Sequence, residues 1–260
     1  MNSYADLHIH TLYSDGTFTP REVVELAHKQ GFLAIAITDH DCIDGIEPSI
    51  AHAAKYGMEI IPAVELTAEE EDFEVHMLGY FIDWQAEWFT EKLKEIRTAR
   101  VNRTYEMIAK LKGIGINIDP RKVFKISGPG SVGRLHLASA LYSGGWTSSI
   151  GEAFRKYIGN NAPCYVRKFK LALKEAIDVI IRLGGVPVLA HPHTLGRDDL
   201  IPVLTKWGLR GIEVYHTGHS ANVTSHYEKL ALKNNLLLTG GSDCHGMGKS
   251  SVLLGRLKVP

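Results

Sequence analysis

Histidines spaced for metal binding occur near the start of this chain. His8 and His10 are two residues apart at the end of a short apolar run, residues 4–9. If that run is a strand, side chains at positions i and i+2 share a face, so both imidazoles point the same way. Asp15 follows after a turn closed by Gly16. Two such histidines with a nearby carboxylate make half of a metal site, although an isolated H-x-H motif is more often a packed or surface pair.

The rest of the chain supplies further residues of the same kind. Five predicted strands carry His, Asp or Glu at or near their ends, and a sixth strand carries one histidine earlier in its length. Buried imidazoles and carboxylates need partners, so packing alone does not explain this recurrence. In a closed barrel the carboxyl ends of the strands converge on one pocket. The candidate metal ligands are His8, His10, Asp15, His40, Glu65, His76, His191, Asp243 and His245.

This set of residues indicates more than one metal ion. A catalytic zinc takes about three protein ligands, so nine candidates are enough for two or three ions. Glu65 is suited to bridging, because a carboxylate can bind two cations through its two oxygens. A set of His, Asp and Glu without a thiolate suits Mn, Zn or Fe. Cys244 lies between two candidate ligands and is expected to point away. The predicted cofactor is therefore two or three divalent ions of Mn, Zn or Fe.

Such a centre predicts a particular chemistry. Three divalent ions bring about six positive charges against three carboxylates, which favours an anionic substrate. The expected nucleophile is a metal-bound hydroxide, because coordination lowers the pKa of water from about 16 to about 7. Metal pairs about 3.5–4 Å apart suit in-line attack at phosphorus. The pattern therefore predicts a hydrolase that acts on phosphate esters.

Alternating strands and helices are expected to position these residues. A capping box at residues 19–22 begins a helix, and residues 33–38 form an apolar strand of the kind that is buried on both faces. Later helices are predicted at 49–56, 173–183, 198–207 and 222–234, and later strands at 59–66, 74–81, 186–190, 211–215 and 236–239. This order predicts a largely parallel sheet with helical crossovers, closed into an α/β barrel. His76 lies early in its strand, which leaves two options open: an antiparallel strand or a tilted one.

The alternation is interrupted between residues 84 and 170. Residues 87–112 are predicted to form one long helix, followed by a break at 113–120, a loop at 127–131 and another helix from Gly133. Residues 89–170 hold sixteen Lys and Arg against five Asp and Glu, although the whole chain has no net charge. This excess indicates an anionic partner or a solvated basic face. We expect a barrel made of residues 1–83 and 171–260, and a mostly helical, basic insertion at 84–170 that caps the substrate.

Composition and apolar patterning indicate the cellular location of the protein. No apolar run approaches the ~20 residues of a membrane helix, and the N-terminus lacks the pattern of a signal peptide. The three cysteines are widely spaced and odd in number, which favours a reducing compartment over a disulfide framework. We therefore expect a cytoplasmic protein that does not bind a membrane, and nothing in the sequence indicates an obligate protein partner.

Several short motifs occur in an order that is characteristic of one superfamily. They are DLHIHT at residues 6–11, SDG at 14–16, TDHD at 38–41, AHPH at 190–193 and GSDCH at 241–245, together with Glu65 and His76. These motifs resemble those of the polymerase-and-histidinol-phosphatase (PHP) superfamily over the whole chain. GRLHLA at 133–138 resembles the signature of its small stand-alone phosphoesterases, although Leu135 stands where proline is common. That branch includes nucleoside 3′,5′-bisphosphate phosphatases and a 5′-3′ exoribonuclease acting on short RNAs.

The resemblance implies a distorted (β/α)7 TIM-like barrel with a trinuclear site. One ion would be bound by His8, His10, Glu65 and Asp243, a second by Glu65, His76 and His191, and a third by Asp15, His40 and His245. It also implies that Arg134 and His193 are catalytic, with Arg134 orienting the phosphate as a bidentate donor. The proton for the leaving oxygen would come from His193 or from a metal-bound water. The implied substrate-binding residues are Arg134, His136, His193 and His216.

The expected substrate is a 3′,5′-bisphosphonucleotide or a short oligoribonucleotide. Histidinol phosphate is an alternative that uses the same kind of site, but its amine would favour a pocket lined by carboxylates rather than a basic insertion. A second alternative is a non-catalytic binding module, like the PHP domains of polymerases that have lost their metals. Every candidate ligand position is filled here, and no polymerase domain is fused to the chain. Hydrolysis of a nucleotide phosphate ester is therefore the favoured prediction.

Overall fold

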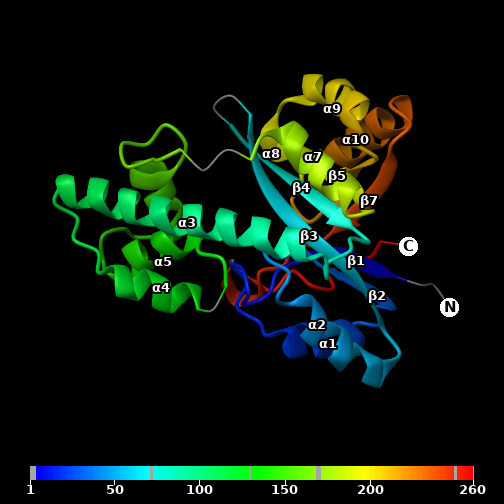
Figure 1. The fold of residues 1–260 in the computed structure, drawn as a ribbon, viewed down its shortest axis with the longest axis horizontal. Coiled ribbons are helices and arrows are strands. Elements are labelled where there is room, and N and C mark those ends of the chain that lie inside the picture. The colour runs from blue at the N-terminus through cyan, green and yellow to red at the C-terminus, as the bar shows by residue number, and fades with distance from the viewer. Residues whose placement is uncertain (1–3, 71–72, 129, 168–170, 249–250, 260) are drawn as a thin grey trace.

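The computed structural model describes residues 4–70, 73–128, 130–167, 171–248 and 251–259. Its centre is a seven-stranded sheet in which each strand pairs with its neighbours along the chain (Figure 1). Near the end of the sheet, the His10 N–H donates to the Cys244 carbonyl at 3.0 Å, which brings the first strand beside the segment after the last. The sheet therefore curls into a nearly closed barrel, and the predicted fold class is confirmed. The strands are β1 (Ala5–Ile9), β2 (Ala34–Ile37), β3 (Glu59–Glu70), β4 (Phe73–Tyr80), β5 (Val186–Leu189), β6 (Gly211–His216) and β7 (Leu237–Gly241).

One strand of the barrel runs against the others. β4 is antiparallel to both β3 and β5, whereas the other neighbouring pairs are parallel. β3 and β4 form a long hairpin in which Thr67 faces His76. Because β4 is reversed, its early residues lie at the same end of the barrel as the carboxyl ends of the parallel strands. The antiparallel option is therefore correct, and it explains why His76 comes early in its strand.

Helices cover the outside of the barrel. α1 (Pro20–Lys29) begins with the predicted capping box, in which the Thr19 hydroxyl accepts from the Glu22 N–H and the Glu22 carboxylate accepts from the Thr19 N–H. α2 (Ile46–Ala53) begins earlier than predicted and ends in a 3-10 turn at Ala54–Tyr56. The remaining barrel helices are α7 (Leu173–Arg182), α8 (Pro192–Leu195), α9 (Ile201–Trp207) and α10 (Ala221–Lys233).

The segment between β4 and α7 is helical. It contains α3 (Glu87–Gly113), α4 (Pro120–Ser127), α5 (Arg134–Ser143) and α6 (Ile150–Ala153), and α6 continues into a π-helical turn at Phe154–Ile158. α4 is missing from the sequence prediction, although its start carries a clear local signal. The Asp119 carboxylate accepts from the Arg121 N–H, and Pro120 occupies the first helical position. The predicted break therefore ends where this short helix begins.

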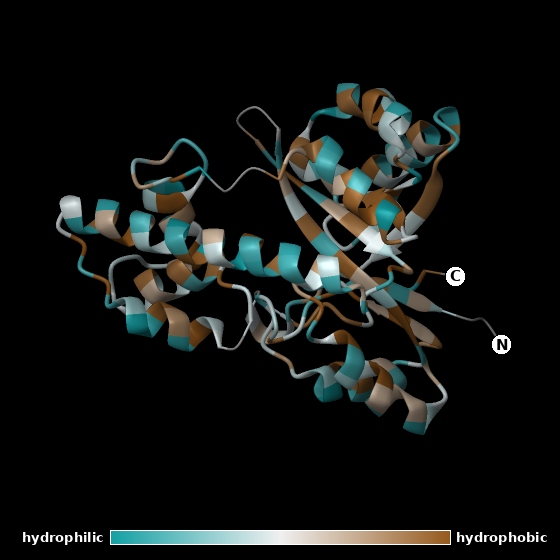
Figure 2. Cartoon of the chain, in the orientation of Figure 1, coloured by the Kyte–Doolittle hydropathy of each residue, from teal (hydrophilic) through white to brown (hydrophobic). Residues whose placement is uncertain are grey.

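α3 connects two separate hydrophobic cores. Phe89 and Leu93, in its first half, are fully buried in the core of the barrel. Met107 and Leu111, in its second half, pack in a different core with residues of α4 and α5. Figure 2 shows hydrophilic and hydrophobic residues mixed along the helices of this region. Among the described residues, no helix combines the length and apolar composition that crossing a membrane requires.

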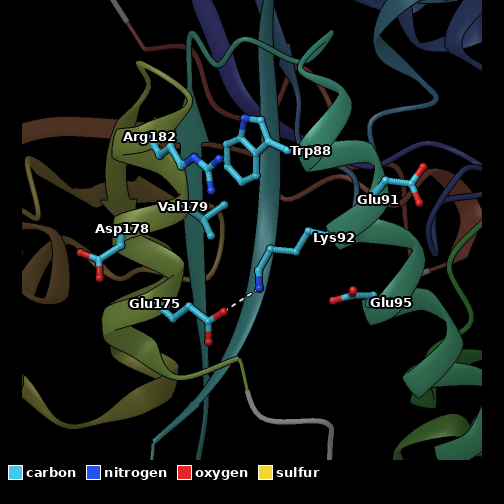
Figure 3. Close-up of a pocket in the computed structure, with 8 residues that line it drawn as sticks. All are labelled: Trp88, Glu91, Lys92, Glu95, Glu175, Asp178, Val179 and Arg182. Carbon is cyan, nitrogen blue, oxygen red and sulfur yellow. Dashed lines mark hydrogen bonds and ion pairs between the residues drawn. The ribbon is translucent and has the colours of Figure 1, made fainter.

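Polar contacts attach the first half of α3 to the barrel helix α7 (Figure 3). Lys92 Nζ lies 2.6 Å from Glu175 Oε1, and the Arg182 guanidinium carbon lies 3.9 Å from the centre of the Trp88 ring. An ion pair and a cation–π contact at this level of exposure each contribute only about 0.5–1 kcal/mol. The buried apolar residues of α3 therefore contribute more to its position than these contacts do.

Candidate metal centre

Glu65 lies at the centre of the predicted ligands. Its side chain projects from β3 and is buried. One oxygen, Oε2, lies 3.3 Å from His8 Nε2, 3.1 Å from His10 Nε2 and 3.2 Å from His40 Nδ1. The other oxygen, Oε1, lies 2.8 Å from His76 Nδ1 and 3.2 Å from His191 Nε2. The two oxygens of one carboxylate thus face two groups of imidazoles, which is the arrangement that a bridging ligand requires.

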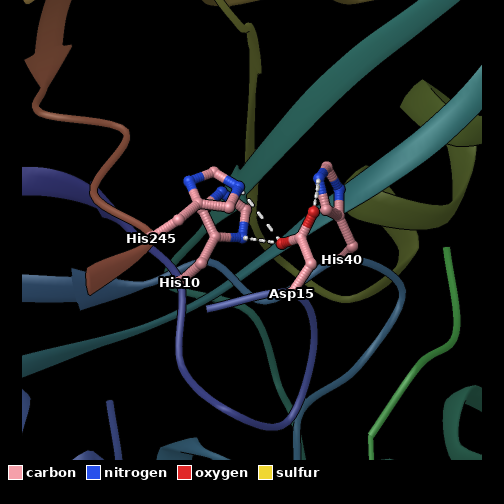
Figure 4. A group of neighbouring side chains, drawn as sticks. All are labelled: His10, Asp15, His40 and His245. Atoms are coloured by element: carbon pink, nitrogen blue, oxygen red, sulfur yellow. Dashed lines mark ion pairs between the residues drawn. The ribbon is translucent and has the colours of Figure 1, made fainter. Parts of the chain in front are cut away.

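Two aspartates complete the cluster. Asp15 Oδ1 lies 3.1 Å from His245 Nε2, and its other oxygen lies 3.8 Å from His40 Nε2. Figure 4 shows Asp15 pointing toward these histidines and His10. Asp243 Oδ1 lies 3.3 Å from His10 Nε2 and 3.4 Å from His245 Nδ1. The structure therefore brings all nine candidate ligands together.

The side chains fall into four groups whose donor atoms lie close enough to share an ion. Asp15, His40 and His245 come together with His10, and His8 and His10 come together with Asp243. Glu65 belongs to two further groups, one with His8 and His191 and one with His40 and His76. These groups overlap with the three sets implied by the family resemblance, but they do not reproduce them one by one. The assignment of ligands to individual ions thus stays a prediction.

Hydrogen bonds fix the tautomers of four of these histidines. His8 Nδ1–H donates to Glu213 Oε1 at 2.9 Å, and His245 Nδ1–H donates to the carbonyl of Asp243 at 2.9 Å. His10 Nδ1–H donates to the Ser14 hydroxyl, which itself donates to Asp39. His191 Nδ1–H donates to the Thr194 hydroxyl, which itself donates to the His191 carbonyl. In a neutral imidazole the other nitrogen then carries a lone pair. All four Nε2 lone pairs therefore face carboxylate oxygens.

This arrangement is unfavourable unless a cation or a proton lies between the donor atoms. His10 Nε2, Asp15 Oδ1, His40 Nδ1 and His76 Nδ1 are buried and make no hydrogen bond within the described residues. A buried polar atom without a hydrogen bond costs about 1–3 kcal/mol. Histidines that orient one nitrogen by a hydrogen bond and present the other are typical of metal ligands. The residues therefore fit a set of divalent ions.

The pKa values of the cluster reflect the same need for positive charge. Burial by itself would raise the pKa of Glu65, but His40, His76 and His8 lower it well below its usual range. Burial likewise lowers the pKa of His10, but the nearby carboxylates of Asp243 and Glu65 outweigh it and raise this pKa to about 10. Without a cation, a proton is thus retained on His10, whereas burial lowers the pKa of His40 to about 3 and leaves that ring neutral. A metal ion can replace this proton, because binding requires the neutral imidazole.

Two of the candidate ligands have an unusual backbone conformation. His191 and Asp243 have φ angles of 25° and 52°, a region that non-glycine residues rarely adopt. Such conformations cost on the order of 1–3 kcal/mol and occur mainly at functional sites. Both residues are predicted metal ligands.

Glu213, in β6, is a site residue that the sequence prediction missed. Its carboxylate is fully buried and accepts both from His8 Nδ1 and from the backbone N–H of His191 at 2.7 Å. It therefore orients one candidate ligand and holds the strained backbone of another. A carboxylate inside the apolar strand at 211–215 was the available signal, because such a residue is not expected in a buried strand without a partner.

Replacing Glu213 with glutamine is expected to weaken metal binding by about 10–100-fold. The glutamine amide has only one accepting oxygen, so it cannot accept the hydrogen bonds from both His8 and the His191 N–H. It also lacks the negative charge that attracts the His8 ring. Metal affinity is measured by titration of the metal-free protein with zinc. Glu228→Gln is the control, because Glu228 contacts only the nearby Tyr215 hydroxyl among the described side chains. Equal affinities in both variants and the wild type would exclude an orienting role for Glu213.

Arg134 is at the edge of this cluster. It is the first residue of α5, and its guanidinium donates to Asn160 Oδ1 at 2.7 Å and to Glu74 Oε1 at 3.2 Å. With Asp15, His40 and His76 it lines a cavity of about 140 Å³. The predicted phosphate-binding arginine and three predicted metal ligands thus share one cavity.

The other predicted substrate contacts are arranged differently. His193 and His216 lie together, with ring centres 5.3 Å apart, and His216 Nε2 is 3.6 Å from Asp243 Oδ2. His136 is buried, and its Nδ1 accepts from the Gly133 N–H at 3.0 Å, so this nitrogen caps α5. The geometry thus gives His136 a structural role in addition to any contact with substrate.

Two arginines of α3 line the same cavity and were not singled out from the sequence. Arg100 is buried and pairs with Asp41 and Thr67. Arg103 Nε donates to the Val166 carbonyl at 2.8 Å, while its buried Nη2 makes no hydrogen bond within the described residues. Their three-residue spacing on a helix places both on one face. That spacing, within the basic segment, was the available sequence signal.

Comparison with known proteins identifies the family. The family model of the PHP domain matches residues 6–128. A 3′,5′-nucleoside bisphosphate phosphatase from Chromobacterium violaceum is 32% identical over 250 residues, which cover 94% of this chain and 88% of that protein. This chain belongs to the PHP family. A second relative is a 5′-3′ exoribonuclease from Haemophilus influenzae. It is 31% identical over 250 residues, which cover 94% of this chain and 91% of the exoribonuclease.

A solved structure shares the whole PHP fold. It is described as a metal-dependent phosphoesterase from Bifidobacterium adolescentis and matches with a TM-score of 0.87 at 32% identity, covering 96% of this chain and 90% of that chain. The likeness extends over the helical insertion as well as the barrel. The PHP family and the barrel predicted from the motifs are therefore confirmed.

Proposed function

We propose that this PHP protein hydrolyses phosphate esters of nucleotides, either a 3′,5′-bisphosphonucleotide or a short oligoribonucleotide. Two or three divalent ions of Mn, Zn or Fe are held by His8, His10, Asp15, His40, Glu65, His76, His191, Asp243 and His245. The observation that carries the proposal is that four histidines with fixed tautomers present Nε2 lone pairs to buried carboxylates. Such a set needs cations, and bound divalent ions supply an activated water and stabilise negative charge at phosphorus.

The protein's own residues orient the substrate. Arg134 presents a planar fork of donors to the cavity, which matches the oxygens of a phosphate group. Arg103 adds a buried Nη2 that makes no hydrogen bond in the described part of the chain, so it can donate to an anion without breaking an existing contact. His193 and His216 lie on the side of the site where Asp243 is found. The two arginines hold the phosphate beside the cluster, and the two histidines lie next to it.

We further propose that residues 84–170 form a substrate cap on a barrel made of residues 1–83 and 171–260. The separate hydrophobic core of this segment supports the division. Its excess of Lys and Arg supports a substrate with more than one phosphate, because a basic surface attracts polyanions. The names of the two relatives, a bisphosphate phosphatase and an exoribonuclease, also describe substrates of this kind. The three free, buried cysteines support a cytoplasmic location.

A substrate panel tests this proposal. Phosphate or nucleotide release is measured from a 3′,5′-bisphosphonucleotide, a short 5′-phosphorylated RNA and histidinol phosphate, with manganese and with zinc. We expect turnover of one or both nucleotide substrates and loss of that turnover when a chelator removes the metal. Release from histidinol phosphate alone would assign the alternative phosphatase activity. Metal-loaded protein that is inactive on all three would instead indicate a binding module.

A further inference from the structure

Three histidines form a second cluster beside the candidate metal centre. His193 is in α8, His216 ends β6, and His219 follows in the next loop. The His193 and His219 rings are nearly perpendicular, with centres 4.3 Å apart. His219 has no place in the proposed ligand set, and the sequence did not single it out. Its contacts nevertheless connect it to His193, one of the residues proposed to contact the substrate.

Hydrogen bonds determine which nitrogen of each ring carries a proton. His219 Nδ1 lies 2.7 Å from the Val214 carbonyl oxygen, and its Nε2 lies 2.7 Å from His193 Nδ1. A carbonyl oxygen only accepts, so the proton of this bond is on His219 Nδ1. In the neutral ring His219 Nε2 is then an acceptor, and His193 Nδ1 must be the donor. His193 Nε2 is left as a lone pair.

The surroundings hold His219 in this state. Burial, the largest effect, lowers the pKa of His219, and the hydrogen bond to Val214 only partly offsets it. The neutral ring is therefore the main form near neutral pH. The centre of the Tyr227 ring lies 5.5 Å from that of His219 in a stacked arrangement, and the Tyr227 hydroxyl donates to Asp198 at 3.1 Å, which holds Tyr227 against His219.

The Nε2 atom of His193 faces the loop next to the metal centre. A Cβ built on Gly218 would lie 3.2 Å from His193 Nε2 and 3.0 Å from His216 Nδ1. His216 in turn approaches Asp243. Within the described residues, His193 Nε2 has no hydrogen-bond partner of its own. This nitrogen is therefore free to accept a hydrogen bond from a group that enters beside the loop.

We propose that His219 is a positioning residue that fixes the tautomer of His193, so that His193 Nε2 serves the site as a hydrogen-bond acceptor. Its partner is a hydroxyl group, either of the substrate or of a water beside the phosphate. This role rests on the proposed phosphoesterase function, but the tautomer itself does not. In this state His193 Nε2 carries no proton, so it cannot protonate the leaving oxygen. Another group must therefore donate that proton.

The tautomer can be observed directly by ¹⁵N NMR of histidine-labelled protein loaded with zinc, which is diamagnetic. His193 is assigned by the signals lost in His193→Gln. We expect wild-type His193 to be protonated at Nδ1 and unprotonated at Nε2. His219→Leu should abolish this preference, whereas His219→Gln should retain it because the amide oxygen can still accept. On the nucleotide substrate that is hydrolysed fastest, kcat/KM should fall about tenfold in His219→Leu, because the loss of one hydrogen bond has an effect of about this size. In His219→Gln, kcat/KM should return to the wild-type value.

The control is His28→Gln, because His28 is an exposed histidine of α1 that stacks on Tyr56, away from this cluster. Its variant should match the wild type in both measurements. A wild-type His193 protonated at Nε2, or a tautomer unchanged in His219→Leu, would overturn the proposal. Loss of one equivalent of zinc in His219→Leu would also overturn it, by showing that the three histidines bind a metal. Protein that is inactive on every phosphate ester but shows the expected tautomer would refute the proposed function alone.

Discussion

Replacing Glu65 with glutamine is expected to lower kcat on the nucleotide substrate by about 1,000-fold, which corresponds to roughly 4 kcal/mol. The reason is geometric. Both oxygens of this carboxylate face imidazoles, at 2.8 to 3.3 Å from five histidine nitrogens. An amide of the same size retains one acceptor but loses the charge and the second oxygen, so it cannot bridge two cations.

Metal content and activity are measured on the same preparations, by elemental analysis and steady-state kinetics. We expect Glu65→Gln to lose at least one ion per chain while its circular dichroism spectrum stays that of the wild type, because the ligands lie at strand ends. Glu91→Gln is the control, since Glu91 is an exposed residue of α3 that pairs with Lys94. A Glu65→Gln variant with the full metal content and normal kcat would refute the central position of this residue.

Removing the side chain of Arg134 is expected to reduce kcat/KM by about 100-fold, mainly through a higher KM. A charge-assisted hydrogen bond contributes about 1.5–3 kcal/mol, which corresponds to this range. Arg134 lines the cavity with Asp15 and His76, and its interaction with Glu74 at 3.2 Å keeps it there. Arg134→Lys should recover only part of the loss, because an ammonium lacks the planar fork.

A matched variant separates a specific contact from general attraction. Arg121, in α4, belongs to the same basic segment but is 91% exposed and pairs with Asp119. Arg121→Ala removes the same charge, and we expect its KM to stay within about twofold of the wild type, as for an exposed pair. If both variants raised KM equally, Arg134 would act only through the charge of the segment. An unchanged KM in Arg134→Ala would remove Arg134 from the site.

The local sequence determined most of the secondary structure and the kind of site. The capping box at Thr19 and the apolar strand around Ile35 were correct because they depend on neighbouring residues. The candidate ligands could be named because metal binding demands particular side chains and because strand ends meet in a barrel. α4 was missed even though Asp119 and Pro120 mark its start, because it is a short helix between the predicted break and the predicted loop.

By itself, the sequence thus determined the PHP family, the alternation of strands and helices, and which nine residues are the candidate metal ligands. Only the tertiary structure decided the direction of β4, because side chains alternate with the same period in a parallel and an antiparallel strand. It also decided the roles of Glu213 and His219, which depend on contacts with His8 and His193 far away in the sequence. Those contacts form only when the barrel closes, and no local pattern encodes the distance between two such atoms.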